Sequence, residues 1–229
     1  NHPNLQQIPS RGQFAKDIRK IFIPEMGEYW LKADYSQQEP RLLTHFARLV
    51  DQPGSGEVQK AYLEKDLDFH QQTADMAGVQ RNLAKTIGLG VMYGMGYHKL
   101  ARELDMEPQE AKAMLQDFHA KVPFMKGMLE AVMNRANSKG VIRTLLGRKC
   151  RFDLWEPTQW GVHKALPLNQ AQTEYGMAIK RAYTYKALNR LIQGSAADQT
   201  KKAMVDVYEE IGIVPLIQVH DELDCSVKD

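Results

Sequence analysis

The 229-residue sequence contains only two cysteines, Cys150 and Cys225, and they form no Cys-x-x-Cys pair. A disulfide framework and a cysteine zinc site are therefore excluded, and a reducing, intracellular setting is favoured. Long apolar runs are also missing, because stretches such as residues 89–93 fall far short of the roughly 18 residues that a membrane-spanning helix needs. Proline and glycine, at 10 and 16 residues, are too scarce for a collagen-like or low-complexity chain.

Charge of one sign is not in excess, because 30 Lys and Arg residues are balanced by 28 Asp and Glu residues. The cations are unevenly distributed, however: residues 121–151 carry eight of them and a single acid, Glu130. Such a tract is typical either of a solvated helix face or of a surface that binds a polyanion such as nucleic acid. The apolar share of 43% indicates a globular chain, in one large domain or two interdigitated ones. The start at Asn1 and the strand-like end at 227–229 indicate a fragment without a visible leader.

Hydrophobic patterning predicts β-structure at both ends of the chain and mostly helices between them. Residues 18–23 and 29–33 flank a Pro/Gly turn and predict a hairpin, and residues 214–219 and 223–227 predict another. A short third hairpin is predicted within residues 140–153. We expect the first and last β-rich segments to meet in one antiparallel sheet, which gives an α+β fold with a discontinuous domain.

Helices are predicted where apolar residues recur at helical spacing. The first begins at Ser36-Gln37-Gln38-Glu39, which has the form of a capping box. Further helices are expected over residues 57–76, 80–96, 108–120, 124–138 and 171–210, the last with an interruption near 189–194.

Two carboxylates lie at element ends from which side chains can converge. Asp34 follows the strand 29–33, and Asp221 lies at the tip of the last hairpin. Taken singly, each is ordinarily a helix cap or a polar turn residue. Together they supply the oxygen ligands that Mg²⁺ prefers, and two such ions can stabilise the entering and leaving oxygens of a phosphoryl transfer.

A row of cationic side chains is predicted on one helix. Arg81, Lys85 and Leu89 are spaced four residues apart and share one stripe, with Tyr93 at its edge and His70 earlier in the chain. Cations at this spacing repel each other weakly, which favours an anionic ligand. The alternative is that Arg81 and Lys85 simply pair with nearby acids.

Glycine is frequent in the same predicted helix, at Gly88, Gly90, Gly94 and Gly96. The spacing matches neither G-x-G-x-x-G nor the P-loop pattern. Because a glycine costs about 1 kcal/mol relative to alanine inside a helix, we expect another surface, such as a flat base pair, to approach closely here.

Several motifs, in order and spacing, resemble those of the family A DNA polymerases, and the likeness covers nearly the whole chain. They are Pro3–Pro9, Asp34–Arg41, Arg81-x-x-x-Lys85 with Tyr93-Gly94, Gly147-Arg148-Lys149, Gln193–Asp198, and Val219-His220-Asp221-Glu222. Some residues within these motifs are similar to those of phage members of the family. The resemblance implies an α+β right-hand polymerase fold with an antiparallel β-sheet palm and mostly helical fingers. Residues 1–45 and 165–229 correspond to the palm and residues 46–164 to the fingers, while thumb and exonuclease domains are expected before the first residue.

The resemblance also implies template-directed DNA synthesis by a monomeric core in the cytoplasm, with primer–template DNA and dNTPs as partners. In that family pattern Asp34 and Asp221, helped by the backbone of Tyr35, hold two Mg²⁺ ions. Glu222 is an auxiliary acid near the metals, and Lys85 protonates the pyrophosphate leaving group.

Six residues are implied to contact the incoming dNTP, and they are His70, Arg81, Lys85, Glu39, Tyr93 and Leu89. By resemblance, Glu39 excludes a 2′-hydroxyl and hydrogen-bonds Tyr93, although the capping box offers it a structural role as well. Leu89 departs from the family, which usually has Phe or Tyr at the position that packs against the nucleotide sugar. Pro40 and Gly88 are further departures from the family pattern.

Five residues match family positions that contact primer and template near the new pair, and they are Arg41, Asn189, Gln193, Gln218 and His220. Acceptors at purine N3 and pyrimidine O2 occur in the minor groove of every base pair, so donors there check pair shape without reading sequence. Two other functions are kept as alternatives. One is a nucleotide- or DNA-binding fragment that is inactive without a thumb; the other is a metal-dependent nuclease, for which the sequence offers no extra carboxylate cluster.

Overall fold

The computed structural model describes residue 8 and residues 12–65, 67–159, 161 and 163–228. The chain divides into two compact units. Unit 1 comprises Asn1–Gln38 and Ala196–Asp229, and unit 2 comprises Glu39–Ser195. The predicted domain boundaries at residues 45 and 165 stay predictions, and the motif Pro3–Pro9 lies outside the described residues except for Ile8.

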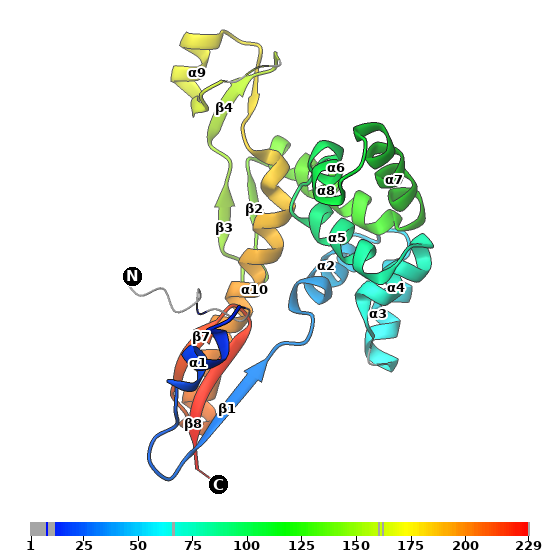
Figure 1. Cartoon of the computed structure of the whole chain (residues 1–229). Coiled ribbons are helices and arrows are strands. Elements are labelled where there is room, and N and C mark those ends of the chain that lie inside the picture. The colour runs from blue at the N-terminus through cyan, green and yellow to red at the C-terminus, as the bar shows by residue number, and fades with distance from the viewer. Residues whose placement is uncertain (1–7, 9–11, 66, 160, 162, 229) are drawn as a thin grey trace. The chain divides into compact units, whose positions relative to one another are not determined.

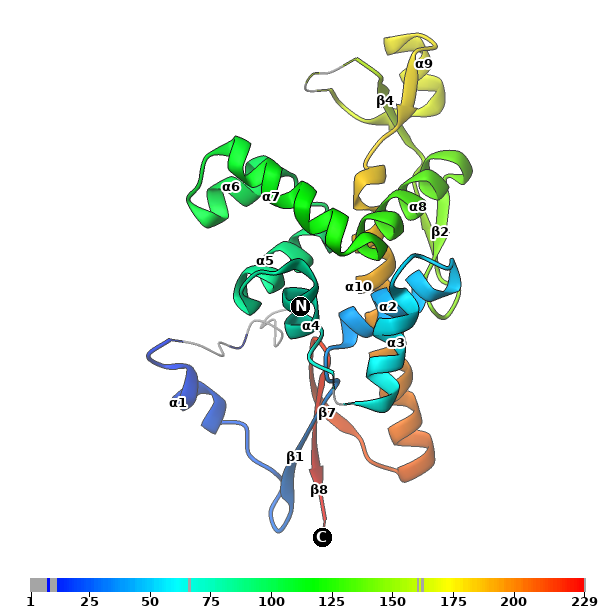
Figure 2. The same ribbon diagram turned by 90° about the vertical axis from the view of Figure 1, so that its right-hand side faces the viewer.

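Unit 1 contains a three-stranded antiparallel sheet in the order β1-β8-β7, formed by Tyr29–Asp34, Glu222–Val227 and Pro215–Val219. Figures 1 and 2 show the first strand lying beside the last one, although they come from opposite ends of the chain. Among its strand residues, Ile217, Leu223 and Cys225 are buried. The predicted meeting of the two β-rich ends in one sheet is therefore confirmed.

The predicted hairpin between residues 18–23 and 29–33 is wrong. Residues Ala15–Lys20 form helix α1, with Asp17 in its first turn and Arg19 and Lys20 in its last turn. This charge order suits the helix dipole, and β1 pairs with β8 instead of with the preceding segment.

Unit 2 is mainly helical. Its helices up to residue 139 are α2 (Gln38–Leu49, which starts at the last residue of unit 1), α3 (Ser55–Glu64), α4 (Phe69–Ala77), α5 (Arg81–Met92), α6 (Tyr97–Leu104), α7 (Pro108–Lys121) and α8 (Pro123–Lys139). Their core contains the fully buried Phe69, Phe118 and Phe124, of which Phe69 and Phe124 meet edge to face at 6.2 Å between ring centroids. Within the described residues no helix is both long and apolar enough to cross a bilayer.

Two helix predictions need correction. The helix expected over 80–96 ends at Met92, because Gly94 adopts a left-handed φ of +72° and α6 starts after it. The long helix expected over 171–210 is interrupted at 176–183 instead of at 189–194, because Gly176 ends α9 and a strand follows. The elements there are α9 (Leu168–Tyr175), β6 (Ile179–Arg181), the 3-10 turn η2 (Thr184–Lys186), α10 (Ala187–Asp206) and the π-helical turn η3 (Val207–Ile211).

Three of the four glycines between residues 88 and 96 do not meet an open surface, whereas a side chain at Gly96 would meet nothing within 4 Å. A side chain at Gly88 would touch Met125, one at Gly90 would collide with Met95, and one at Gly94 would meet the backbone of Tyr185. The close approach that glycine permits at these three positions is therefore made by groups of the chain itself, and a base pair is not needed to explain them.

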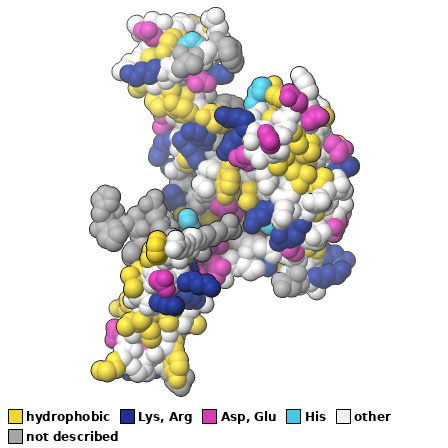
Figure 3. Space-filling model, viewed as in Figure 1, with side chains coloured by type: hydrophobic (Ala, Val, Ile, Leu, Met, Phe, Trp, Pro, Cys, Tyr) yellow, Lys and Arg dark blue, Asp and Glu magenta, His cyan; other side chains and the backbone are white. Residues whose placement is uncertain are grey.

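The remaining strands of unit 2 form two small antiparallel sheets. The predicted hairpin is present as β2 (Val141–Arg143) and β3 (Lys149–Arg151), while β5-β4-β6 is a sheet that the sequence did not predict, with β4 at Leu154–Pro157 and β5 at Leu166–Pro167. Arg181 of β6 connects its sheet to α8 and to the residue after β3, since its guanidinium donates to the carbonyls of Asn137 and Phe152 and lies over the Trp155 ring. Figure 3 shows Lys and Arg side chains gathered near β2, β3 and the start of α10.

Candidate active site

In unit 1, strand pairing brings the predicted acids together. Asp34 ends β1 and lies directly opposite Glu222, the first residue of β8. The Tyr35 amide donates a hydrogen bond to the Asp221 carbonyl at 3.2 Å, and the side chains of Asp34 and Asp221 are themselves hydrogen-bonded. The structure thus unites Asp34, Tyr35, Asp221 and Glu222, as the sequence predicted for the carboxylates.

Both turns that carry these acids contain a non-glycine residue with positive φ. His220, in the two-residue loop between β7 and β8, has φ +54°, and Gln37, between Asp34 and α2, also has φ +54°. Such conformations cost about 1–3 kcal/mol and persist only where the surroundings enforce them. Here the hairpin and the start of α2 fix the backbone on either side of the acids.

The charges in this acidic cluster are only partly compensated. Lys32 Nζ lies 3.0 Å from Glu222 Oε1 and 3.5 Å from Asp224 Oδ2. Among the described residues, Asp34 and Asp221 have no cationic partner. The pKa of Asp34 is raised by partial desolvation, by the charges of Asp221 and Glu222, and by its hydrogen bond with Asp221.

This donor set fits a hard divalent cation. The groups that converge are carboxylates, and the like charges that raise the pKa of Asp34 are the charges that a cation would neutralise. Within the described residues, no group of three or more His, Cys, Asp or Glu side chains forms a complete metal cage. An ion that keeps several waters and also uses substrate oxygens, as Mg²⁺ does, needs no such cage.

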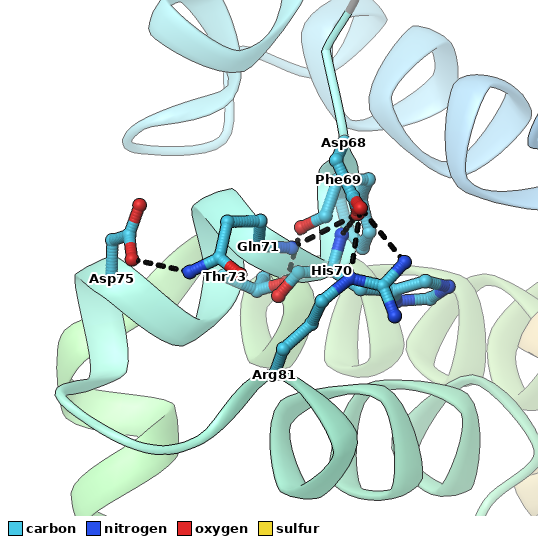
Figure 4. Close-up of polar contacts among 7 residues, drawn as sticks. All are labelled: Asp68, Phe69, His70, Gln71, Thr73, Asp75 and Arg81. Atoms are coloured by element: carbon cyan, nitrogen blue, oxygen red, sulfur yellow. Dashed lines mark hydrogen bonds and ion pairs between the residues drawn. The ribbon is translucent and has the colours of Figure 1, made fainter.

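In unit 2, the N-terminal turns of α4 and α5 carry the predicted cationic row. Arg81 and Lys85 are exposed residues of α5, whose residues Ala84, Ile87 and Gly88 are buried. Arg81 is paired, because its Nε and Nη2 atoms lie 2.8 Å and 2.7 Å from Asp68 Oδ2 (Figure 4). Lys85 forms no ion pair with any described residue.

Asp68 also caps α4. Its Oδ1 accepts hydrogen bonds from the backbone amides of His70 and Gln71, both at 3.0 Å. Partial burial, the largest single effect, raises the pKa of the Asp68 carboxyl. The hydrogen bonds and charge of Arg81 and the two backbone amides together outweigh it, so that the pKa is lowered overall. Asp68 was not predicted as a site residue from the sequence, although an Asp directly before a helix is a recognisable N-cap signal.

His70 is half-buried and lies next to the cations. Partial burial lowers its pKa first, and the charges of Lys85 and Arg81 lower it further, while Asp68 opposes them. Its buried Nδ1 atom has no hydrogen-bond partner among the described residues. His70, Arg81 and Lys85 therefore form a compact group of potential hydrogen-bond donors to an anion. We call these three residues the cationic row, and Asp68 lies beside them.

The remaining dNTP-contact predictions concern α2 and the end of α5. The Tyr93 hydroxyl donates to Glu39 Oε2 at 2.5 Å, so the predicted Glu39–Tyr93 hydrogen bond is present. Gln193 of α10 also hydrogen-bonds Tyr93. Burial and Glu39 raise the pKa of the Tyr93 hydroxyl, which keeps it protonated as the donor. Leu89 is half-buried in α5, which ends just before Tyr93.

The residues expected to contact DNA are distributed between the units. In unit 1, Gln218 Nε2 donates to the His220 carbonyl at 2.5 Å. In unit 2, the Arg41 guanidinium lies 4.4 Å from the centre of the Tyr62 ring, and Asn189 is half-buried in α10. Their contacts with DNA stay predictions.

Comparison with known proteins agrees with the motif order. The family model for DNA polymerase family A matches residues 1–229. The chain belongs to this family. It is 38% identical to a DNA-directed DNA polymerase of Pseudomonas phage M6, over 100% of this chain and 37% of that protein, and 34% identical to the thermostable DNA polymerase I of Thermus aquaticus, over 96% and 25%.

A solved polymerase structure has the same fold. The POL domain of Pol1 from M. smegmatis, in complex with DNA primer-template and dNTP, matches with a TM-score of 0.77 and 30% identity, over 99% of this chain and 38% of that chain. The predicted α+β polymerase fold is therefore confirmed. The chain spans about a quarter to two fifths of these family A relatives.

Proposed function

We propose that this chain carries the nucleotidyl-transfer centre of a template-directed DNA polymerase, which extends a primer 3′-hydroxyl with dNTPs. The observation that supports this most directly is the union of Asp34, Asp221 and Glu222 at the paired ends of β1 and β8. Family membership supplies the reaction class. The partners are primer–template DNA and dNTPs, and the catalytic core acts as a single copy in the cytoplasm.

Asp34, Asp221 and the backbone beside Tyr35 would hold two Mg²⁺ ions, with Glu222 as an auxiliary acid. When bound, the ions lower the pKa of the primer hydroxyl and neutralise charge on the triphosphate. The two acids orient the primer terminus toward the α-phosphorus. The 3′-hydroxyl loses its proton to solvent water as its oxygen forms a bond to the α-phosphorus. The bond from that phosphorus to the bridging oxygen breaks, and pyrophosphate leaves.

The cationic row binds the triphosphate in this proposal. Lys85 and Arg81 are exposed on one helix face, and Lys85 has no competing ion pair among the described residues. His70 adds a ring nitrogen with an unused hydrogen-bonding capacity. As pyrophosphate departs, Lys85 donates a proton to the bridging oxygen, which becomes the terminal oxygen of the leaving group.

Glu39, held by Tyr93, excludes nucleotides that carry a 2′-hydroxyl, and Leu89 packs against the sugar. The 2.5 Å hydrogen bond between Tyr93 and Glu39 supports this role because it fixes the carboxylate. Arg41, Asn189, Gln193, Gln218 and His220 contact primer and template at the new pair.

Primer extension tests this function directly. The 229-residue chain is incubated with a labelled primer–template, Mg²⁺ and four dNTPs, and compared with Asp34→Ala and Asp221→Ala. We expect either substitution to lower extension by at least about 10³-fold, as removal of a group that acts in a catalytic unit does. Extension that survives both substitutions would overturn the assignment. Binding of dNTP without any extension would restrict the chain to nucleotide binding, and primer degradation without dNTPs would indicate a nuclease.

A further inference from the structure

The two oxygens of the Asp68 carboxylate contact two different helices. Oδ1 accepts the amides of His70 and Gln71 at the start of α4, and Oδ2 accepts Nε and Nη2 of Arg81 at the start of α5. Figure 4 shows Asp68 between the two helix starts, with the Arg81 guanidinium directed at it. We infer that Asp68 is a positioning residue for triphosphate binding, which holds Arg81 in its binding orientation; this inference rests on the function proposed above.

The geometry leaves Arg81 able to bind a second anion. A guanidinium carries five N–H donors, and the contacts to Asp68 use the Nε edge and one Nη2 hydrogen. Three N–H donors remain for phosphate oxygens. Because the Arg81 side chain is 43% exposed, it would otherwise sample several rotamers, and the two-point contact removes that freedom before a ligand arrives.

The same carboxylate fixes the backbone of His70. By accepting the His70 amide, Asp68 sets the first turn of α4, from which the imidazole projects. Asp68, which lies outside the cationic row, thereby orders His70 and Arg81, two members of the row on separate helices. Pre-ordering of this kind strengthens binding because less conformational entropy is lost when the ligand binds.

An opposite role is the main competitor of this inference. A carboxylate beside the cationic row adds a negative charge, and by Coulomb repulsion alone it would weaken triphosphate binding. Positioning and repulsion therefore predict opposite signs when the charge is removed. The sign of one binding measurement separates them.

Asp68→Asn separates the two contacts of the carboxylate. Asparagine caps a helix about as well as aspartate, so its Oδ1 still accepts the hydrogen bonds of the His70 and Gln71 amides. Its NH₂ group is a donor and cannot accept the hydrogen bonds of Arg81, so that contact is lost. Asp68→Ser, a second neutral cap, guards against a folding defect specific to Asn. The matched control is Asp75→Asn, because Asp75 lies on α4, which Asp68 caps, and its carboxylate accepts from the Gln71 side chain at 2.8 Å without contacting Arg81 (Figure 4).

Affinity for inorganic tripolyphosphate is measured by titration calorimetry on the 229-residue chain, in the wild type and in an Arg81→Ala background. We expect Asp68→Asn to raise the dissociation constant about tenfold despite the lost negative charge. Asp75→Asn should leave it unchanged or slightly lower it. In the Arg81→Ala background Asp68→Asn should have no weakening effect, because the residue acts through Arg81.

Each outcome decides a different point. One outcome is that the wild type binds tripolyphosphate, Arg81→Ala weakens this binding, and Asp68→Asn leaves the affinity unchanged or tighter. In that case the positioning role is overturned and the triphosphate site stands. Weakening that persists without Arg81 also overturns it, since the helix cap alone would then be responsible. A wild type that does not bind tripolyphosphate removes the triphosphate site and the role of Asp68 with it.

A second readout needs no ligand. In the wild type, the Arg81 Nε–H is hydrogen-bonded and should exchange slowly with solvent in ¹⁵N-resolved spectra. Asp68→Asn should make this exchange fast, and Asp75→Asn should not. Unchanged exchange in Asp68→Asn would show that the contact does not hold Arg81 and would overturn the inference.

Discussion

The two candidate sites differ in how their charges are balanced. In the acidic cluster of unit 1, Asp34 and Asp221 have no cationic partner among the described residues, and Lys32 serves only Glu222 and Asp224. In the cationic row of unit 2, Asp68 neutralises part of the charge and orders Arg81. The acidic cluster therefore depends on an external cation to relieve its repulsion, whereas the cationic row is ordered before any ligand binds.

The two sites also differ in how they are built. Lys32 and Glu222, which frame the acidic cluster, are 190 positions apart in sequence, while Asp68 and Arg81 are 13 apart. A site made by long-range strand pairing is sensitive to register, because a one-residue slip turns side chains to the opposite face. A site made by two neighbouring helix starts is sensitive to its cap and its ion pair.

The largest expected effect concerns Lys85, the lysine of the cationic row, which forms no ion pair with any described residue. Lys85→Ala should weaken tripolyphosphate binding by about 10- to 100-fold, the effect of a lost charge-assisted contact of roughly 1.5–3 kcal/mol. Lys99→Ala is the matched control, because Lys99 is an exposed lysine of the same unit that pairs with Glu103 at 3.6 Å. Equal affinities for both variants would mean that Lys85 is not the main free cation of the row.

A smaller effect is expected in unit 1, where removing one acid should relieve repulsion. Like charges opposed across a strand pair cost about 0.2–1 kcal/mol, so Asp34→Asn should raise the thermal midpoint without metal by about 1–4 °C. Mg²⁺ should stabilise the wild type, as any ligand of the folded state does, and should stabilise Asp34→Asn much less.

Glu25→Gln is the control for this measurement, because Glu25 is an exposed acid of the same unit outside the cluster. It should leave both the metal-free midpoint and the Mg²⁺ response at wild-type values. If Asp34→Asn responds to Mg²⁺ as strongly as the wild type, Asp34 is not a ligand of the ion.

The smallest expected effect is a change in titration. The pKa of His70 should lie below 6.5 in the free chain, because partial burial and the nearby Lys85 disfavour the imidazolium. Since the unfolded chain binds this proton more tightly, the stability contributed by neutral His70 is present above pH 6.5 and decreases as the pH falls below it. In an NMR titration, Lys85→Ala and tripolyphosphate should each raise this pKa, and Lys99→Ala should not; an identical His70 curve in all samples would contradict the proposed proximity.

Much of the site could be predicted from the sequence, because its residues lie in motifs with fixed order. The approach of Asp34 to Asp221, and the hydrogen bond between Tyr93 and Glu39, were expected from a family resemblance and are present. Their assigned roles in catalysis and nucleotide selection stay predictions. Asp68 was missed because it lies outside the motif that starts at Arg81, and its importance appears only when α4 and α5 are packed together.

The fold errors have local causes. Residues 18–23 contain three isoleucines and a phenylalanine and so favour a strand, but charge order and the pairing of β1 with β8 leave residues 15–20 helical. The sheet β5-β4-β6 was missed because its strands are only two to four residues long, too short to show a periodic pattern. Periodicity located the long helices and could not locate these strands.

The pairing of β1 with β8 sets the time at which the acidic cluster can form during translation. The ribosome makes β8 about 190 residues after β1, which takes on the order of 10–40 s at about 5–20 residues per second. The hairpin β7–β8 can close as soon as it emerges, but β1 must wait, unpaired, until then. A nascent chain therefore completes its helical unit before its acidic cluster can form, and a chaperone that shields β1 would act within that interval.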